Sequence, residues 1–111
     1  MILKTHYYNV KQKNEKPRIF IESKDPVISG FSIGKKYNIE YENGKIILSL
    51  SENGTRKVAI RIASKTRKIA IPVLDLNHKE MNSFPIGSKA KVEYSTNTIT
   101  ITNERNSDYE I

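Results

Sequence analysis

The residues of this chain most suited to chemistry are cations. Between Asn53 and Leu74 the sequence holds six basic residues and no acidic one. Lys and Arg bind phosphate by charge, and Arg also by paired N–H donors. The segment therefore predicts contact with a nucleic acid backbone, although Lys on an exposed edge strand also prevents unwanted pairing. The candidate nucleic-acid-binding residues, with two cations from the preceding part of the chain, are Arg18, Lys24, Arg56, Lys57, Arg61, Lys65, Arg67 and Lys68.

Other side chains offer little catalytic potential. His6 and His78 are the only histidines, and neither has metal-ligand spacing around it. His78 beside Asp75 can be drawn as a metal or acid–base pair, but a turn histidine is far more common. The absence of cysteine excludes thiol catalysis, disulfides and thiolate metal sites. Ser32 lies in GFSIG, which is not the nucleophile elbow G-x-S-x-G. We therefore predict no enzyme activity, no catalytic residue, no metal and no cofactor.

Size and composition set the broad class. The chain has 111 residues, of which 37% are hydrophobic, so it suits one domain, or two very small ones that share a modest core. Its formal net charge of +7 favours polyanionic partners, nucleic acid first and an acidic protein or membrane surface after that. MILKTHYYNV lacks the apolar run of a signal peptide, and no segment is apolar enough to span a membrane. The prediction is a soluble, cytoplasmic protein with no membrane partner, in which self-association as a homodimer is open.

The strand that must position the cations can be predicted from the alternation of apolar and polar residues. In RKVAIRIASKTRK, Val58, Ile60 and Ile62 alternate with more polar residues, which predicts a strand with one inward face and one cationic face. ASKTRK then reads as a basic loop. Few aromatic residues lie nearby, which disfavours a single-strand binder that stacks bases. Duplex DNA contacted through its backbone fits better.

A repeat organises the rest of the chain. FSIGKKYNIEY (31–41) returns as FPIGSKAKVEY (84–94), with Gly34 aligned to Gly87. Each copy predicts a strand, a short connection, a turn with glycine, a strand, a hairpin and a last strand. Because open strand edges tend to pair, we expect the two copies to complete each other. The Phe and Ile of each turn, two residues apart, are expected in the core.

Local turn chemistry and the chain ends refine this division. Asn43-Gly44 between two strand-like runs predicts a type I′ hairpin, and Thr96-Asn97 a weaker counterpart. Residues 1–10 suit an edge strand, and 11–16 a loop. The predicted organisation is an N-terminal extension (1–15), a first hairpin unit (16–52), a basic linker strand or loop (53–66), a second hairpin unit (67–103) and a frayed tail (104–111).

The repeated pattern resembles AbrB-like swapped-hairpin domains, with the SymE-like branch nearest in character. The resemblance lies in PRIFI (17–21), GFSIGKKY (30–37), IEY (39–41) and GKIIL (44–48). PVLDLN (72–77) also resembles a stretch in the tandem leading region of some phage-type cytosine methyltransferases. The resemblance as a whole covers roughly residues 16–102. It implies a mainly β fold, in which two tandem swapped-hairpin units form a pseudo-dimeric small β-barrel with short helical turns. Ser83 and Pro85 depart from the pattern in the second unit.

The resemblance and the charge together suggest three functions. The first is a non-enzymatic binder of duplex DNA, acting as a phage or mobile-element regulator. The second is a small inhibitor of a host defence complex, in the manner of anti-CRISPR or anti-restriction proteins, that binds a protein or nucleoprotein. The third is a SymE-like toxin that targets RNA.

Overall fold

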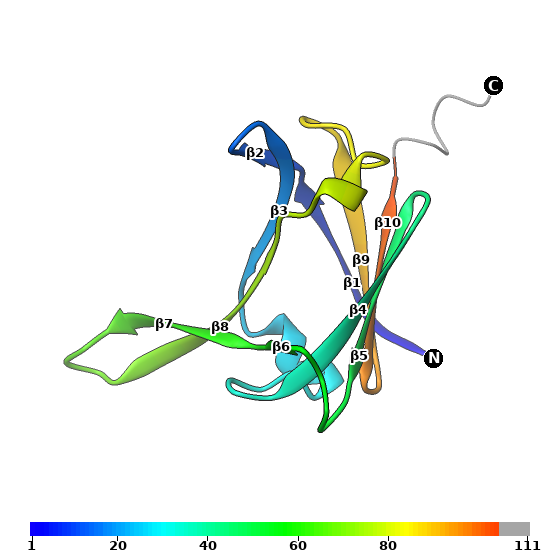
Figure 1. Cartoon of the computed structure of the whole chain (residues 1–111). Helices are drawn as coiled ribbons and strands as arrows, with labels where there is room; N and C mark the ends of the chain where they lie inside the picture. Colours follow the sequence, from blue (N-terminus) through cyan, green and yellow to red (C-terminus); the bar gives the residue numbers. More distant parts are fainter. Residues whose placement is uncertain (105–111) are drawn as a thin grey trace.

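The structure, a computed structural model, describes residues 1–104, apart from the side chain of Glu80. It is mainly β, as predicted, with short 3-10 turns between strands (Figure 1). The elements in chain order are β1 (Ile2–Asn9), β2 (Lys11–Lys13), β3 (Lys16–Glu22), η1 (Asp25–Ser29), β4 (Lys36–Glu42), β5 (Lys45–Leu50), β6 (Arg56–Lys57), β7 (Ala59–Ser64), β8 (Ile69–Leu76), η2 (Lys79–Met81), β9 (Lys89–Ser95) and β10 (Thr98–Asn103). The tail 105–111, for which the sequence predicts fraying, lies outside the described residues.

The strands form two sheets. One has six strands in the order β1-β9-β10-β5-β4-β6, and the other has four in the order β2-β3-β8-β7. Apolar residues alternate along the central strands, as in β10, where Ile99 and Ile101 are buried and Thr100 between them is less so. The buried residues of β3 and β8 join those of the larger sheet in a single core. The sheets do not close into a barrel, so this part of the expected architecture is wrong.

The two copies of the repeat occupy equivalent places. Gly87 lies 53 residues after Gly34, and the same offset carries the bounds of β4 and β5 onto those of β9 and β10. Gly34 and Gly87 have φ of 89° and 91°, a conformation that glycine adopts without steric cost. At the hairpin tips, Gly44 and Asn97 also correspond, with φ of 74° and 61°. The expectation that the two copies complete each other is confirmed, because β5 pairs with β10 and β3 with β8.

The equivalence extends beyond the repeated sequence. Val10, between β1 and β2, exchanges backbone hydrogen bonds with the Gly87 turn: Gly87 N donates to Val10 O and Val10 N to Ser88 O, both at 2.8 Å. Val58, between β6 and β7, does the same with Gly34 and Lys35 at 3.0 and 2.9 Å. β1 pairs with β9 and β6 with β4, so each copy lends its first strand to the other. β1 and β6, which lead into Val10 and Val58, are thus corresponding parts of two interleaved units, and so are β2 and β7, which follow these valines.

The structure confirms some of the local predictions and corrects others. Phe31 and Phe84 are buried, as predicted, but Ile33 and Ile86 are 39% and 47% exposed, so their core assignment is wrong. Both isoleucines lie in turns that reach past the edge of the core rather than in an extended strand. Residues 1–10 form the predicted edge strand β1. The expected loop 11–16 instead contains β2 and a tight turn into β3.

The hairpin expected at Asn43-Gly44 is present, but its turn is not type I′. Glu42 pairs with Lys45, so the loop has two residues. A type I′ turn needs positive φ at both central positions, and Gly44 has it whereas Asn43 does not. No helix among the described residues is both long enough and apolar enough to cross a membrane.

Candidate nucleic-acid interface

A two-stranded ribbon of β7 and β8 projects from the body of the molecule (Figure 1). The residues of its turn, Lys65–Lys68, are all exposed, and three of them are cations: Lys65, Arg67 and Lys68. The turn is organised by the Ser64 hydroxyl, which accepts a hydrogen bond from Arg67 N at 3.2 Å, and by Lys68 with φ of 54°. Among the side chains that the structure describes, none of the ion pairs involves any of these three cations. The basic loop predicted from ASKTRK is therefore confirmed as the tip of a ribbon.

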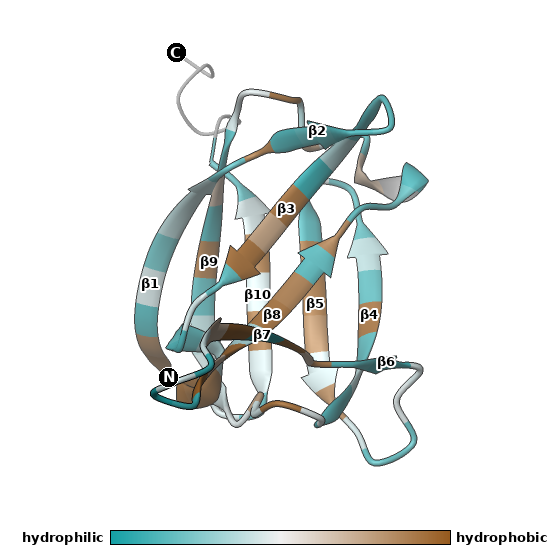
Figure 2. Cartoon of the chain, turned by 90° about the vertical axis from the view of Figure 1, so that its left-hand side faces the viewer, coloured by the Kyte–Doolittle hydropathy of each residue, from teal (hydrophilic) through white to brown (hydrophobic). Residues whose placement is uncertain are grey.

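The ribbon has two chemically different faces. Cross-strand partners share a face of an antiparallel pair, so Ile60 lies beside Pro72 and Ile62 beside Ala70. Arg61 and its partner Ile71 lie on the opposite face. Figure 2, in which hydrophobic residues are brown, shows such residues along both β7 and β8. The alternation predicted for this strand is therefore present, but its apolar face does not pack inward along its whole length as predicted.

The apolar face of β7 is not in the core. Val58 is 2% exposed, as predicted, but Ile60 and Ile62 are each 52% exposed, which corrects the expectation that all three point inward. β7 is the edge strand of its sheet, and Ile60 and Ile62 keep about half of their surface exposed there. Alternation along a strand identifies an apolar face but carries no information on what lies against it.

Arg18 is engaged within the protein. Its Nε and guanidinium Nη2 donate to the two oxygens of Asp75 at 2.9 Å each, and its guanidinium lies 4.4 Å from the centre of the Phe20 ring. The Lys13 ammonium lies 3.9 Å from the same carboxylate. Asp75, which the sequence suggested only as a companion for His78, is thus the centre of a cationic cluster that joins β3 to β8.

These contacts shift the titration of both partners. The hydrogen bonds from Arg18 hold the pKa of the Asp75 carboxyl below its ordinary value, against the opposing effect of partial burial. The same hydrogen bonds raise the pKa of the Arg18 guanidinium. Asp75 is therefore an ionised structural partner at neutral pH, and Arg18 is not available to a phosphate without breaking a bidentate pair.

Two further arginines make internal contacts. Arg61 forms a 2.5 Å ion pair with Glu22 on the face of the sheet opposite to the buried Ile21 and Leu74. The Arg56 guanidinium donates to the Asp75 backbone oxygen at 3.1 Å. Of the eight predicted residues, the structure thus brings Arg18 and Arg56 together at Asp75, and it gathers Lys65, Arg67 and Lys68 at the ribbon tip. Lys57 is exposed on the edge strand β6, and Lys24 is exposed beside η1.

The histidines occupy separate surroundings. His78 stacks on Tyr41, with ring centroids 4.7 Å apart, and His6 stacks on Tyr8 at 4.5 Å. The His6 Nδ1 also lies 3.5 Å from the Asp25 carboxylate. Within the part of the chain that the structure describes, no group of three or more His, Asp or Glu side chains is placed to hold a metal ion.

Comparison with known proteins returns no relatives. A scan against protein-family models finds no match, and searches of curated proteins and of solved structures find no significant one.

Proposed function

We propose that this protein binds duplex DNA without cleaving it, chiefly through the sugar–phosphate backbone, and acts as a regulator of a phage or mobile element. The observation that carries the proposal is the projecting β7–β8 ribbon, whose turn holds three exposed cations that form no ion pair with the described side chains. A two-stranded antiparallel ribbon fits the width of the B-DNA major groove. Cations at its tip would then meet phosphates or guanine edges.

The charge distribution supports the same proposal. The acidic groups nearest the ribbon are already neutralised, since Glu22 pairs with Arg61 and Asp75 with Arg18. The remaining cations leave the ribbon with a positive field that attracts a polyanion and accelerates encounter. The likeness to AbrB-like domains noted from the sequence points to the same class of partner.

The test is fluorescence anisotropy of a labelled random-sequence duplex, repeated over a salt series. We expect the logarithm of the binding constant to fall linearly with the logarithm of salt concentration, by about 0.9 per phosphate contacted. The variant with Lys65→Ala, Arg67→Ala and Lys68→Asn should bind more weakly and lower this slope by about 2 to 3. Asparagine is used at position 68 because it tolerates the positive φ there.

The matched control lies in the corresponding hairpin of the first unit. Lys11→Ala, Lys13→Ala and Lys16→Ala remove the same charge from exposed positions on β2 and β3. If both variants lose affinity equally, net charge and not the ribbon governs binding, and the site assignment is wrong. No binding by the wild type at low salt would leave the charge to a protein partner and would reject the proposed function.

A further inference from the structure

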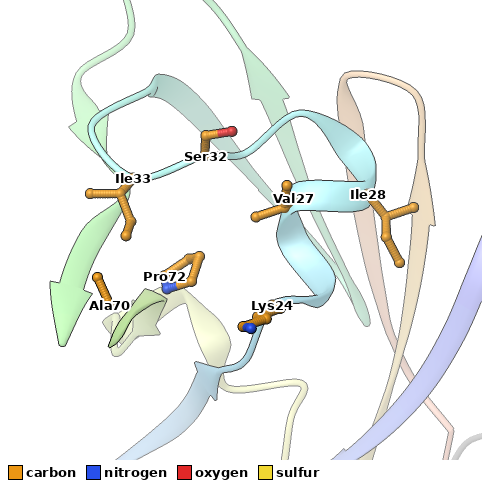
Figure 3. Close-up of a pocket in the computed structure, with 7 residues that line it drawn as sticks. All are labelled: Lys24, Val27, Ile28, Ser32, Ile33, Ala70 and Pro72. Atoms are coloured by element: carbon orange, nitrogen blue, oxygen red, sulfur yellow. The ribbon is translucent and has the colours of Figure 1, made fainter. Parts of the chain in front are cut away.

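An open apolar groove lies between η1 and the ribbon, on a surface separate from the cationic tip. One wall is formed by Val27 and Ile28 of η1 and by Ile33 of the following turn, and the other by Ala70 and Pro72 of β8 (Figure 3). Its volume is about 590 Å³. Val27, Ile28 and Ile33 are 46%, 45% and 39% exposed, which is high for aliphatic side chains that lie together.

The ribbon continues the groove outward. Ala70 and Pro72 are the cross-strand partners of Ile62 and Ile60, so the exposed isoleucines of β7 share their face. The apolar surface therefore extends from η1 along β8 to β7, whose outer edge is unpaired in the sheet. A contiguous apolar surface of this kind marks an interaction site in a folded protein.

The second unit shows what the corresponding position looks like when the chain itself covers it. With the offset of 53 residues, Ile28 corresponds to Met81, which is fully buried. Lys24 corresponds to Asn77, whose side-chain amide donates to Pro17 O at 2.9 Å and to Lys13 O at 3.3 Å. These bonds tie the second unit's connection to the β2–β3 hairpin. In the part of the chain that the structure describes, the Lys24 side chain forms no such hydrogen bond, and the groove of the first unit stays open.

Charge around the groove indicates the occupant. Lys24 stands at its rim, and Lys65, Arg67 and Lys68 lie at the end of the ribbon that forms its wall. The nearest carboxylates are occupied, because Asp25 pairs with Lys4 at 2.8 Å and Glu22 with Arg61. An apolar groove with a cation at its rim and further cations at the end of the adjoining ribbon is complementary to aliphatic or aromatic side chains flanked by carboxylates.

From these observations we infer that the groove binds a segment of another protein that inserts apolar side chains between η1 and β8 and presents Asp or Glu to Lys24 and the ribbon. A second copy of this chain is a poorer occupant, because the formal net charge of +7 on each copy opposes their approach. The apolar groove residues differ from the three tip cations that carry the proposed DNA binding, so a groove variant and a tip variant test the two assignments separately.

The experiment is a selection from a random-peptide library on the immobilised full-length chain. Its matched pair of variants is Ile33→Asp, in the groove wall, and Ile86→Asp, at the corresponding exposed position of the second unit. Both isoleucines are solvent-exposed, so both variants should fold, which circular dichroism and a urea unfolding curve would verify. Peptides enriched on the wild type are then synthesised and their affinities for all three proteins are measured by anisotropy.

We expect the enriched peptides to combine apolar residues with a net negative charge. They should bind Ile33→Asp at least about tenfold more weakly than the wild type and Ile86→Asp with unchanged affinity. Enrichment of peptides without acidic residues, equal affinities for the two variants, or no enrichment at all would overturn the inference. Sedimentation of the wild type as a dimer that Ile33→Asp dissociates would also overturn it, by making a second copy the occupant.

DNA affinity provides an independent readout. Ile33→Asp should leave duplex binding far less affected than the variant of the three tip cations. If the duplex displaces the selected peptides and Ile33→Asp weakens both ligands equally, the groove and the tip form one nucleic acid surface, and the inference of a protein partner is wrong. Failure of DNA binding alone, with peptide selection as expected, would reject the proposed function and leave the groove assignment standing.

Discussion

Ile21 and Leu74 lie directly opposite each other on β3 and β8, although 53 residues of sequence separate them. That separation equals the offset of the repeat, so each residue is paired with its own counterpart. Ile47 and Thr100 show the same relationship on β5 and β10. A pseudo-two-fold axis therefore passes through the centre of both sheets, and the two units meet around it as subunits of a symmetric dimer do.

Truncating either of the two buried side chains at this axis should lower the stability of the fold. Ile21 and Leu74 are both fully buried, so Ile21→Ala and Leu74→Ala should each lower the free energy of unfolding by about 2 to 5 kcal/mol. Because the two side chains are neighbours, the double variant should depart from additivity by about 0.5 kcal/mol or more. Urea unfolding curves measure both quantities. Ile62→Ala, at a half-exposed position, is the control and should change stability by no more than about 0.5 kcal/mol.

The two turn glycines should respond alike to substitution. A Cβ added at Gly34 or Gly87 would meet no atom within 4 Å, so an alanine there incurs the cost of the positive φ alone. We expect Gly34→Ala and Gly87→Ala each to destabilise the fold by about 1 to 2 kcal/mol. Asparagine at either position should recover part of the loss, since it tolerates the left-handed region. Thermal or urea unfolding of the four variants makes the comparison, and very different costs at the two sites would contradict their equivalence.

Asp75 should make stability depend on pH in the acid range. The folded-state pKa of Asp75 is depressed, so its stabilising contribution is complete above the unfolded value of about 3.9 and is lost as pH falls through the lower folded value. Between pH 6 and pH 2, Asp75→Asn should therefore flatten the fall in urea midpoint relative to the wild type. Glu52→Gln removes a carboxylate from an exposed loop position and is the control. Parallel curves for the wild type and Asp75→Asn would show that the Arg18 pair does not contribute.

The ribbon tip should be dispensable for folding. Replacing Lys65–Lys68 by Asn-Gly would close β7 and β8 just beyond the Ser64–Ile69 pair with a tight hairpin turn. We expect the free energy of unfolding to stay within about 0.5 kcal/mol of the wild type, because the replaced residues are exposed. Duplex affinity should fall as far as in the variant of the three tip cations. A large loss of stability would mean that the tip supports the fold, and the affinity comparison would then rest on the substitution variant.

The strands of the repeated units were predictable because their signals are local. The alternation in ITI (99–101) and the turn residues Gly44 and Asn97 act within a few positions of the chain, and they place hairpins where the structure has them. The correspondence of Val10 with Val58 was not visible, because the two segments share almost no sequence and are equated only by the strands they join. A signal for it existed in the valine that each segment places between two strands, Val10 between β1 and β2 and Val58 between β6 and β7.

The cations, too, were only partly predictable from the sequence. The sequence identifies a basic segment and its turn, and the turn is where exposed charge lies. It does not reveal that Arg18 and Arg61 are held by Asp75 and Glu22, because those carboxylates come from other strands and reach the arginines through pairing across the sheet. Sequence alone determined the duplication, the strand pattern and the excess of charge, since each depends on neighbouring residues. Only the tertiary structure decided which strands exchange between units, which cations remain free and which apolar face stays open, because these depend on long-range packing that alternation along one strand cannot specify.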